Sequence, residues 1–309
     1  MWRESQFGCR NDEHVDDALF PNEGNVMPVS IFRAGVGRLS LAGFSFVLAI
    51  GASQAAEPTL PDFIKSQGVL RVGVKCDYPP SGFLDANGKF AGIEVEMAKR
   101  LAEIAFGSPD KAAMQCVTSE ARIPALNGKK VDLIIATLGI YPERQKVIDF
   151  TVPYAWGASS VVQLKDGKAK TLADFKGKTI SVLKGASQAA WLEKNMPDVQ
   201  TLRLNSVAEA LQAMRQGRAD GYTGDTSVLF SLLSANKDLA ILPDEEIFDI
   251  AFIGAGIRKN EPEWKAYLDA QIAKLRAEKF YSKAVPLVVS DPQVSEAMIK
   301  TYESDPPKH

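Results

Sequence analysis

From Val69 onward, short runs of β-branched and apolar residues alternate with segments of helical periodicity. Val69–Val74 is such a run, and the segment after it places four apolar residues on one helical face: Ile93, Met97, Leu101 and Ile104. Strands that alternate with helices of this length pair in parallel through crossover connections. The alternation therefore predicts an α/β protein in which mainly parallel sheets are flanked by helices.

The same pattern continues through a second block that begins after Pro153. We expect strands at Met114–Val117 and Val131–Ala136 in the first block. In the second block we expect them at Ser159–Leu164, Thr179–Leu183, Thr201–Leu204, Ala219–Tyr222, near Leu239 and at Ile250–Ile257. Ser206 and Glu209 have the spacing of a capping box, and Gly217 ends the helix that they begin. No low-complexity linker separates the blocks, so we expect two lobes that are joined directly by strands.

The N-terminal segment has the features of a secretory signal. Two basic residues, Arg33 and Arg38, precede the apolar run Leu39–Ile50 and the small-residue stretch Gly51–Ala56. An apolar run of 12 residues is too short to span a bilayer. We therefore interpret residues 27–55 as a signal peptide that starts at Met27, and residues 1–26 as a non-native upstream extension. The alternative is a buried helix of the fold.

The composition of the mature chain excludes several classes of function. Residues 1–55 contain four of the 36 basic and six of the 38 acidic residues, which leaves 32 of each. A chain without excess positive charge lacks the electrostatic footprint of a protein that binds nucleic acid or anionic membranes. The two histidines are His14 and His309, so the folded core lacks the residue on which Ser-His-Asp catalysis and His-ligated metal sites depend. We expect no metal.

The glycine-rich cofactor motifs are incomplete. Gly254-Ala255-Gly256 lacks the third glycine of a dinucleotide-binding loop, and Gly177-Lys178-Thr179 lacks the first glycine of a phosphate-binding loop. We therefore expect no cofactor.

Several short segments between about Leu60 and Tyr281 carry a resemblance to a known family. They are Gly68–Val74, Asp77–Pro80, Asp85–Lys89, Gly92–Ala98, Val131–Thr137, Pro142–Arg144, Asp149–Thr151, Pro153–Tyr154, and Gly217–Asp220 ahead of Asp225. In this order and spacing they resemble the extracellular solute-binding proteins of the polar amino-acid family, which feed ABC importers.

This resemblance implies a two-lobed periplasmic-binding-protein-like fold with the ligand cleft at the hinge. The first lobe would be discontinuous, with residues 56–157 and 248–309, and the second lobe would comprise residues 158–247. Independently of any family, open α/β sheets bind ligands outside the carboxyl ends of their strands.

Arg144 is the residue implied to hold a ligand α-carboxylate, because its planar guanidinium can donate to both carboxylate oxygens. Gly139 would add a backbone N–H. Ser187 would lie at a helix N-terminus, where unpaired N–H groups favour an anion. The alternatives are a solvent-exposed arginine after Pro142 and, for Ser187, an ordinary N-cap.

Asp225 is implied to accept the ligand's ammonium group, together with the Thr137 hydroxyl. The alternative role of Asp225 is the N-cap of a helix that starts at Thr226. Tyr78 would form a flat wall beside the apolar part of the ligand, and its alternative is a core tyrosine.

Four further residues are possible specificity positions: Lys75, Ser81, Ser119 and Trp156. In relatives for basic amino acids a carboxylate stands near the position of Lys75, so lysine argues against a cationic ligand and favours a polar or acidic one. A solvent-facing lysine beside the cleft is the alternative. Ser81 replaces an aromatic residue of many relatives, which makes one wall of the pocket smaller or wetter.

The mature chain keeps two cysteines, Cys76 and Cys116, because Cys9 lies in the leader. The resemblance makes their strands neighbours, at a spacing that a disulfide can bridge in an oxidising compartment. Two free buried thiols are the alternative.

Together these features predict that the protein binds a polar or acidic amino acid in the periplasm and delivers it to the permease of an ABC importer. We expect a soluble monomer with no nucleic-acid partner and no membrane insertion after signal cleavage. The alternative class is a dehydratase-like enzyme for arogenate or prephenate, because a few such periplasmic enzymes resemble these binding proteins. A third class, a sensor ectodomain, would need a membrane-spanning segment.

Overall fold

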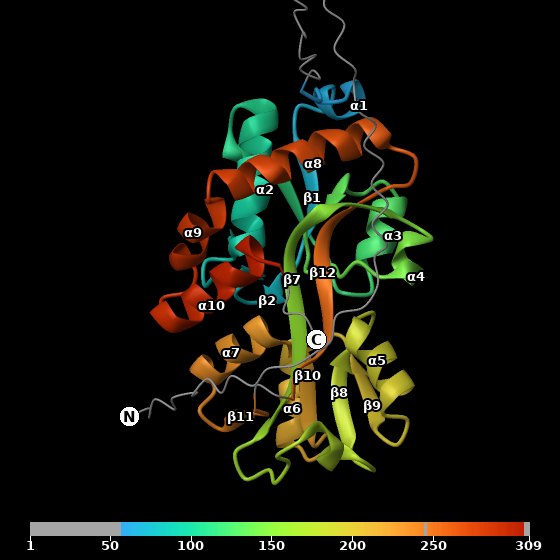
Figure 1. The fold of residues 1–309 in the computed structure, drawn as a ribbon, viewed down its shortest axis with the longest axis vertical. Coiled ribbons are helices and arrows are strands. Elements are labelled where there is room, and N and C mark those ends of the chain that lie inside the picture. Colours follow the sequence, from blue (N-terminus) through green and yellow to red (C-terminus); the bar gives the residue numbers. More distant parts are fainter. Residues whose placement is uncertain (1–56, 244–245, 306–309) are drawn as a thin grey trace, which may run out of the picture. The chain divides into compact units, whose positions relative to one another are not determined.

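The computed structural model describes residues 57–243 and 246–305. The expected upstream extension and signal peptide, residues 1–55, lie outside the described residues. The strands are β1 (Leu70–Val74), β2 (Asp77–Tyr78), β3 (Gly82–Leu84), β4 (Phe90–Ala91), β5 (Ala112–Cys116), β6 (Leu133–Ile134), β7 (Asp149–Leu164), β8 (Thr179–Leu183), β9 (Gln200–Leu204), β10 (Gly221–Asp225), β11 (Leu239–Ile241) and β12 (Phe248–Ile257) (Figure 1). The α-helices are α1 (Asp62–Lys65), α2 (Ile93–Phe106), α3 (Arg122–Asn127), α4 (Pro142–Gln145), α5 (Ser187–Asn195), α6 (Val207–Arg215), α7 (Thr226–Ala235), α8 (Pro262–Ala277), α9 (Phe280–Ala284) and α10 (Pro292–Glu303).

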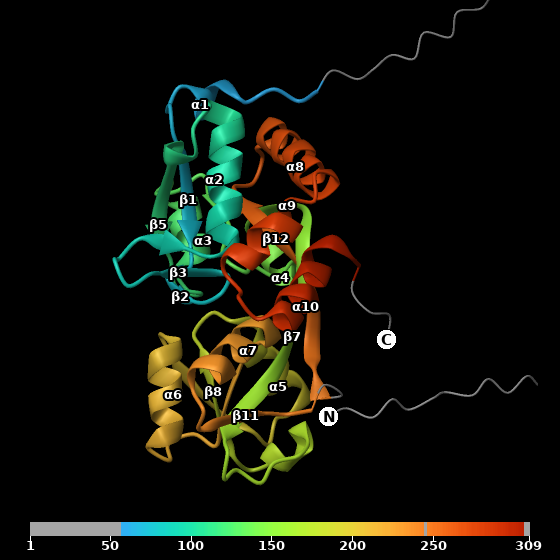
Figure 2. The same ribbon diagram turned by 90° about the vertical axis from the view of Figure 1, so that its left-hand side faces the viewer.

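The fold is the predicted α/β arrangement in two lobes. In the first lobe β5, β1 and β6 pair in parallel, and in the second lobe β10, β8 and β9 pair in parallel. Two long strands, β12 and β7, lie between these groups and pair antiparallel with each other and with their neighbours β6 and β10. Both views show β7 and β12 side by side, with helices around each group of parallel strands (Figures 1 and 2).

Each lobe has its own hydrophobic core. In the first lobe, Val72, Leu101 and Trp264 are buried in a cluster to which both ends of the described chain contribute, from Ile64 to Tyr302. The cores of the second lobe are clusters of its strands and helices, including Tyr222 and Leu229 in one, and Phe175 and Ile180 in the other. β7 contributes Tyr154 and Ala155 to the first lobe and Val161 and Val162 to the second. The backbone therefore passes between lobes within single strands.

The long strand β7 corrects the expectation that a strand begins at Ser159. β7 starts at Asp149 because its first half pairs with β12, from Ile257 opposite Asp149 to Phe248 opposite Ser159. Pro153 cannot donate to a ladder, and it lies opposite Gly254, where the register shifts. The proline therefore interrupts the pairing locally without ending the strand.

Other strand boundaries also differ from the prediction, two of them by the loss of predicted residues at the start of the strand. The strand predicted at Ala219–Tyr222 is β10, which runs from Gly221 to Asp225. It begins later than predicted because the N–H groups of Arg218 and Ala219 donate to the carbonyl of Ala213, near the end of α6. Predicted strand Val131–Ala136 shortens to the two residues of β6.

The predicted capping box at α6 forms only in half. The Ser206 hydroxyl accepts the Glu209 N–H at 3.2 Å, but the Glu209 carboxylate accepts from Asn205 rather than from Ser206.

Two further predictions are confirmed. Cys76 and Cys116 form a disulfide that joins the ends of β1 and β5, with Cα atoms 5.5 Å apart. The predicted apolar face of α2 is buried at Ile93, Met97 and Leu101. Among the described residues, no helix combines the length and the apolar character needed to cross a membrane.

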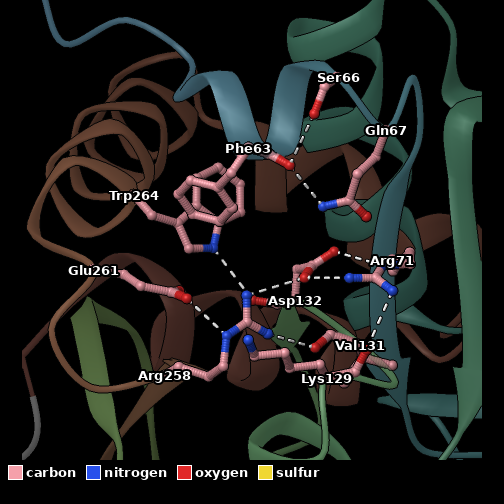
Figure 3. Close-up of polar contacts among 10 residues, drawn as sticks. All are labelled: Phe63, Ser66, Gln67, Arg71, Lys129, Val131, Asp132, Arg258, Glu261 and Trp264. Carbon is pink, nitrogen blue, oxygen red and sulfur yellow. Dashed lines mark hydrogen bonds and ion pairs between the residues drawn. The ribbon is translucent and has the colours of Figure 1, made fainter.

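An ion-pair network closes the end of the first lobe near α1 (Figure 3). The side chain of Asp132 is 1% exposed and accepts two hydrogen bonds from Arg71, both at 2.7 Å, and a third from Arg258 at 3.1 Å. The Trp264 indole donates to the Asp132 carbonyl at 3.2 Å. Asp132 therefore ties β1, β6 and the start of α8 together.

Candidate functional site

A cavity lies where the carboxyl ends of strands from both lobes meet. Lys75 follows β1, Ser187 follows β8, and Asp225 ends β10. The predicted site residues that line this cavity are Lys75, Tyr78, Ser119, Thr137, Arg144, Ser187 and Asp225. Ser81 and Trp156 line an adjoining cavity, which shares Thr137 and Asp225 with the first. Gly139 lines neither of the two.

Asp225 presents its carboxylate to the cavity rather than to its own helix. Oδ2 accepts the Tyr78 hydroxyl at 3.0 Å, and Oδ1 accepts the Gln188 amide at 3.2 Å. Asp225 occupies the N-cap position of α7, but its side chain makes no capping hydrogen bond. The alternative is therefore correct in position, because α7 starts at Thr226 with Asp225 as its N-cap, but the side chain does not cap the helix. Burial raises the pKa of the Asp225 carboxyl, while the Tyr78 hydrogen bond and the charge of Arg122 oppose this rise.

Arg144 is half-buried on α4, so the alternative of a fully solvated arginine is wrong. Its two terminal nitrogens donate to the carbonyls of Gly139, at 2.9 Å, and Gly185, at 3.2 Å. Its guanidinium carbon lies 5.1 Å from the centre of the Tyr141 ring. Burial lowers the pKa of Arg144, which nevertheless stays a cation at neutral pH.

Gly139 lies differently from the expectation, whereas Ser187 begins a helix as expected. Gly139 lies opposite Ile253 in an isolated β-bridge. The hydrogen bonds of this bridge are donated by the N–H groups of neighbouring residues, from Ile140 to the Phe252 carbonyl and from Gly254 to the Leu138 carbonyl. These bonds do not use the Gly139 N–H, and Gly139 instead offers its carbonyl to Arg144. Ser187 is the first residue of α5, and Ala186 is the N-cap, so the N-cap alternative for Ser187 is wrong.

Lys75 is buried, with 2% exposure, which overturns the alternative of a solvent-facing side chain. Its ammonium donates to the Ser119 hydroxyl at 2.9 Å and lies 4.8 Å from the centre of the Tyr78 ring. The nearest carboxylate oxygen, from Asp77, is 3.9 Å away. Burial, aided by the positive charge of Arg122, lowers the pKa of Lys75 to about 8.

Arg122, which was not predicted as a site residue, begins α3 and lines the cavity with only 3% exposure. Its guanidinium donates to four carbonyls: Ala136 at 2.7 Å, Thr137 at 3.0 Å, Ser119 at 3.1 Å and Gly185 at 3.4 Å. Burial, followed by the charge of Arg144, lowers the pKa of Arg122 to about 10. Its position three residues after Ser119, just past a strand end, was the available signal. Arginines on short helices are usually exposed, so this signal was weak.

Gly185 joins the two lobes at the cavity. Its carbonyl accepts from both Arg122 and Arg144, which belong to the first lobe. It has φ +74°, and a Cβ atom there would lie 2.6 Å from the Cα of Glu120. Only glycine permits this left-handed conformation and this close approach.

Two further buried polar residues support the cavity wall. Gln188 donates to Asp225 and to the Ser159 hydroxyl at 2.9 Å. Glu94, 2% exposed, accepts from the backbone N–H of Thr137 at 2.7 Å. Within the described residues, no group of three His, Cys, Asp or Glu side chains could hold a metal ion.

The charges around the cavity are unequal. Its described lining contains three cationic side chains, Lys75, Arg122 and Arg144, and one carboxylate, Asp225. The lining of this partly enclosed cavity therefore carries an excess of positive charge.

Comparisons with known proteins agree with this architecture. The chain is 30% identical over 222 residues to the ABC transporter arginine-binding protein 1 of Escherichia coli K12, covering 69% of this chain and 88% of that protein. A crystal structure of the cysteine-binding protein from Campylobacter jejuni superposes with a TM-score of 0.70 and 31% identity, covering 74% and 92% of the two chains. The ancestral amino acid-binding protein AncCDT-1, a precursor of cyclohexadienyl dehydratase, gives a TM-score of 0.65 and 27% identity, covering 74% and 98%.

Residues 70–285 match the family described as bacterial extracellular solute-binding proteins, family 3. This match covers most of the chain and includes both lobes and the whole cavity lining. The protein therefore belongs to the bacterial extracellular solute-binding proteins of family 3.

Proposed function

We propose that the protein binds an acidic amino acid between its lobes and delivers it to the permease of an ABC importer. The observation that carries this proposal is the charge balance of the cavity, with three cations facing one carboxylate. The carboxylate and the ammonium of a zwitterionic amino acid would pair with one cation and with the one carboxylate of the cavity. The two remaining cations call for a second carboxylate on the ligand.

The α-carboxylate and the ammonium group are assigned to opposite ends of the cavity. Arg144 would hold the α-carboxylate, supported by the N-terminus of α5 at Ser187, where free N–H groups favour an anion. Asp225 would accept the ammonium, with help from the Thr137 hydroxyl. These assignments keep opposite charges in direct contact inside a partly enclosed site.

Lys75, Ser119 and Arg122 are proposed to receive the side-chain carboxylate. The Lys75 ammonium and the Ser119 hydroxyl lie 2.9 Å apart, and the Arg122 side chain lines the same cavity. A basic amino acid would instead add a fourth cation to this group, at a cost of several kcal/mol if unpaired. This is the physical reason for proposing acidic rather than basic specificity. Ser81 and Trp156, which line the adjoining cavity, are proposed as further specificity positions.

Delivery to a permease is proposed from the family and from the two-lobed architecture. Residues 56–157 with 248–309 would form one lobe and residues 158–247 the other, and the ligand would hold them together. The E. coli relative is named as an ABC transporter binding protein. We extend that role to this chain, together with a periplasmic location and a monomeric state.

A dehydratase activity is the second candidate, because AncCDT-1 is described as a precursor of cyclohexadienyl dehydratase. Incubation of the purified protein with arogenate and prephenate, followed by absorbance of the aromatic product, tests this candidate. Turnover in that assay would overturn the proposal of a binding protein without enzymatic activity.

A thermal-shift screen of the twenty amino acids tests the proposed ligand class. A ligand at 100 times its dissociation constant adds about 2.7 kcal/mol to the free energy of unfolding, which raises Tm by several degrees. The informative pairs are glutamate with glutamine and aspartate with asparagine, because each pair differs mainly in the side-chain charge. We expect the acid to shift Tm more than its amide, and lysine and arginine to give no shift. A basic amino acid as the best ligand would overturn the acidic assignment.

A further inference from the structure

Glu94 is a buried carboxylate directly behind the cavity wall. It lies in the first turn of α2 and is 2% exposed. It does not line the main cavity but lines the adjoining one, and Thr137, which lines both, lies against it. Ligand binding as proposed above gives Glu94 no direct contact with the ligand.

Both oxygens of Glu94 are engaged by hydroxyl or amide groups. Oε1 accepts the Thr137 N–H at 2.7 Å and the Tyr154 hydroxyl at 2.5 Å, and Oε2 pairs with the Thr137 hydroxyl at 3.2 Å. Thr137 is therefore held at two points, its backbone and its side chain. Tyr154 is itself buried and stacks on Tyr302 of α10, so Glu94 is fixed from the side away from the cavity.

Thr137 has an unusual backbone conformation that this contact stabilises. Its φ is +49°, which is the left-handed region that β-branched residues rarely adopt. Such a strained conformation persists only when the surrounding structure holds it. The two hydrogen bonds to Glu94, and the bond from Arg122 to the Thr137 carbonyl at 3.0 Å, provide that support.

The Glu94 carboxylate also decides which way the Thr137 hydroxyl points. Burial raises the pKa of Glu94, and the hydrogen bonds from Tyr154 and Thr137 oppose this rise and favour the ionised form. In that form the carboxylate only accepts hydrogen bonds, so the Thr137 hydroxyl donates its proton to Oε2. The free lone pairs of the hydroxyl oxygen can then accept from the ligand. An ammonium group only donates, so it requires an acceptor at this position.

We propose that Glu94 is a positioning residue for the ligand's ammonium group, because it holds Thr137 in place and orients the Thr137 hydroxyl as an acceptor. This inference rests on the proposed binding of an amino acid. Because Glu94 acts through Thr137, it affects recognition of the ammonium group and not recognition of the two carboxylates.

The test compares ligands with and without the ammonium group. Glu94→Gln keeps the shape, but its amide can donate to the Thr137 hydroxyl and turn the hydroxyl proton toward the ligand. Calorimetric titrations would use L-glutamate and glutarate, or L-aspartate and succinate if aspartate is the better ligand. We expect Glu94→Gln to weaken amino-acid binding about tenfold or more, the size expected for a hydrogen bond to a charged group, and to change diacid binding less than about threefold.

Three variants complete the design. Glu103→Gln changes an exposed glutamate on the same helix and should leave both affinities unchanged. Thr137→Val should lose the same preference for the amino acid over the diacid, and adding Glu94→Gln to Thr137→Val should then have little further effect. Thr137→Ser, which keeps the hydroxyl, should retain the preference.

Each outcome of these titrations either supports or overturns the inference. Equal losses for the amino acid and the diacid in Glu94→Gln would show a merely structural role and overturn the inference. If Glu94→Gln does not fold, the ratio measured with Thr137→Val against Thr137→Ser carries the test, and equal ratios in those two variants overturn the inference. A wild-type protein that binds the diacid but not the amino acid would instead overturn the proposed function.

Discussion

The Tyr78 hydroxyl and the Asp225 carboxylate, 147 positions apart in the chain, form a 3.0 Å hydrogen bond across the cavity. The Asp225 N–H also donates back to the Tyr78 oxygen at 3.2 Å. Tyr78 comes from β2 of the first lobe, yet its ring packs in the core cluster of the second lobe. This residue therefore combines the predicted cavity wall with the alternative of a core tyrosine.

Tyr78→Phe should weaken binding of the acidic amino acid by about tenfold or more. The ring and its packing remain, but Asp225 loses a hydrogen bond to a charged group, which is worth about 1.5 to 3 kcal/mol. Titration calorimetry measures the change, and Tyr267→Phe, at a buried tyrosine of the first-lobe core, serves as the control. Unchanged affinity in Tyr78→Phe would show that this bond does not support the ligand-bound state.

Arg144→Met and Asp225→Asn should each weaken binding about 30-fold or more. Each removes one partner of a desolvated ion pair with the ligand, which typically costs about 2 to 5 kcal/mol. Arg100→Met is the matched control, because Arg100 forms its ion pair with Glu103 on the surface of α2. If Arg144→Met binds with wild-type affinity, the carboxylate site has been assigned to the wrong arginine, and Arg122 is the next candidate.

Binding of the acidic amino acid should weaken above about pH 8 because of Lys75. Burial lowers the pKa of Lys75 to about 8, whereas a bound carboxylate favours the charged form and raises that pKa. Above pH 8 binding therefore takes up a proton, and the association constant should fall by up to tenfold per pH unit. Below about pH 8 Lys75 is charged with and without ligand, so its contribution to affinity stays constant.

Calorimetry in buffers of different ionisation enthalpy measures this proton uptake directly. Lys75→Met should remove the uptake that Lys75 contributes and should reduce the preference for the acid over its amide. The ligand's own ammonium titrates equally with both proteins, so the difference between them isolates Lys75. An identical pH profile in the variant would assign the titration to another group.

Reducing the disulfide should destabilise the protein by up to about 4 kcal/mol, from the chain entropy of a closed loop of 40 residues. Urea unfolding of the wild type is compared with Cys76→Ser combined with Cys116→Ser. Equal stability of the two proteins would mean that the bridge constrains the unfolded chain little.

Asp132→Asn should lower the free energy of unfolding by about 3 kcal/mol, because Arg71 and Arg258 lose a buried charged partner. The effect lies at the low end for a buried pair, since Arg71 is 36% exposed and can regain water. Urea unfolding measures the change. Ligand affinity of the folded variant should stay unchanged, and a large loss of affinity would contradict the assignment of Asp132 to stability alone.

Local sequence patterns were sufficient where neighbouring residues decide the outcome. The apolar face of α2 and the limits of strand β8 match the prediction, because each depends on periodicity within one element. The resemblance to a family supplied what periodicity could not, namely that the strands ending near Cys76 and Cys116 are neighbours.

Burial of charged residues was the part that local patterns could not predict. Arg122 is buried because carbonyls of Ser119, Ala136 and Gly185, from separate segments, meet around its guanidinium. β7 likewise extends through Pro153 because β12, about 100 positions later, pairs with it. In both cases a contact between distant segments outweighs the local preference of the residue.

The discontinuity of the first lobe dictates when each part of the chain can fold. A chain that emerges N-terminus first can assemble the cores of the second lobe once Phe248 is available. The core around Val72 and Leu101 must wait for Trp264, Tyr281 and finally Tyr302. Closure of so long a loop is slow. Until the last helix has emerged, the first half of the nascent chain therefore stays incompletely folded and exposes apolar surface that chaperones bind.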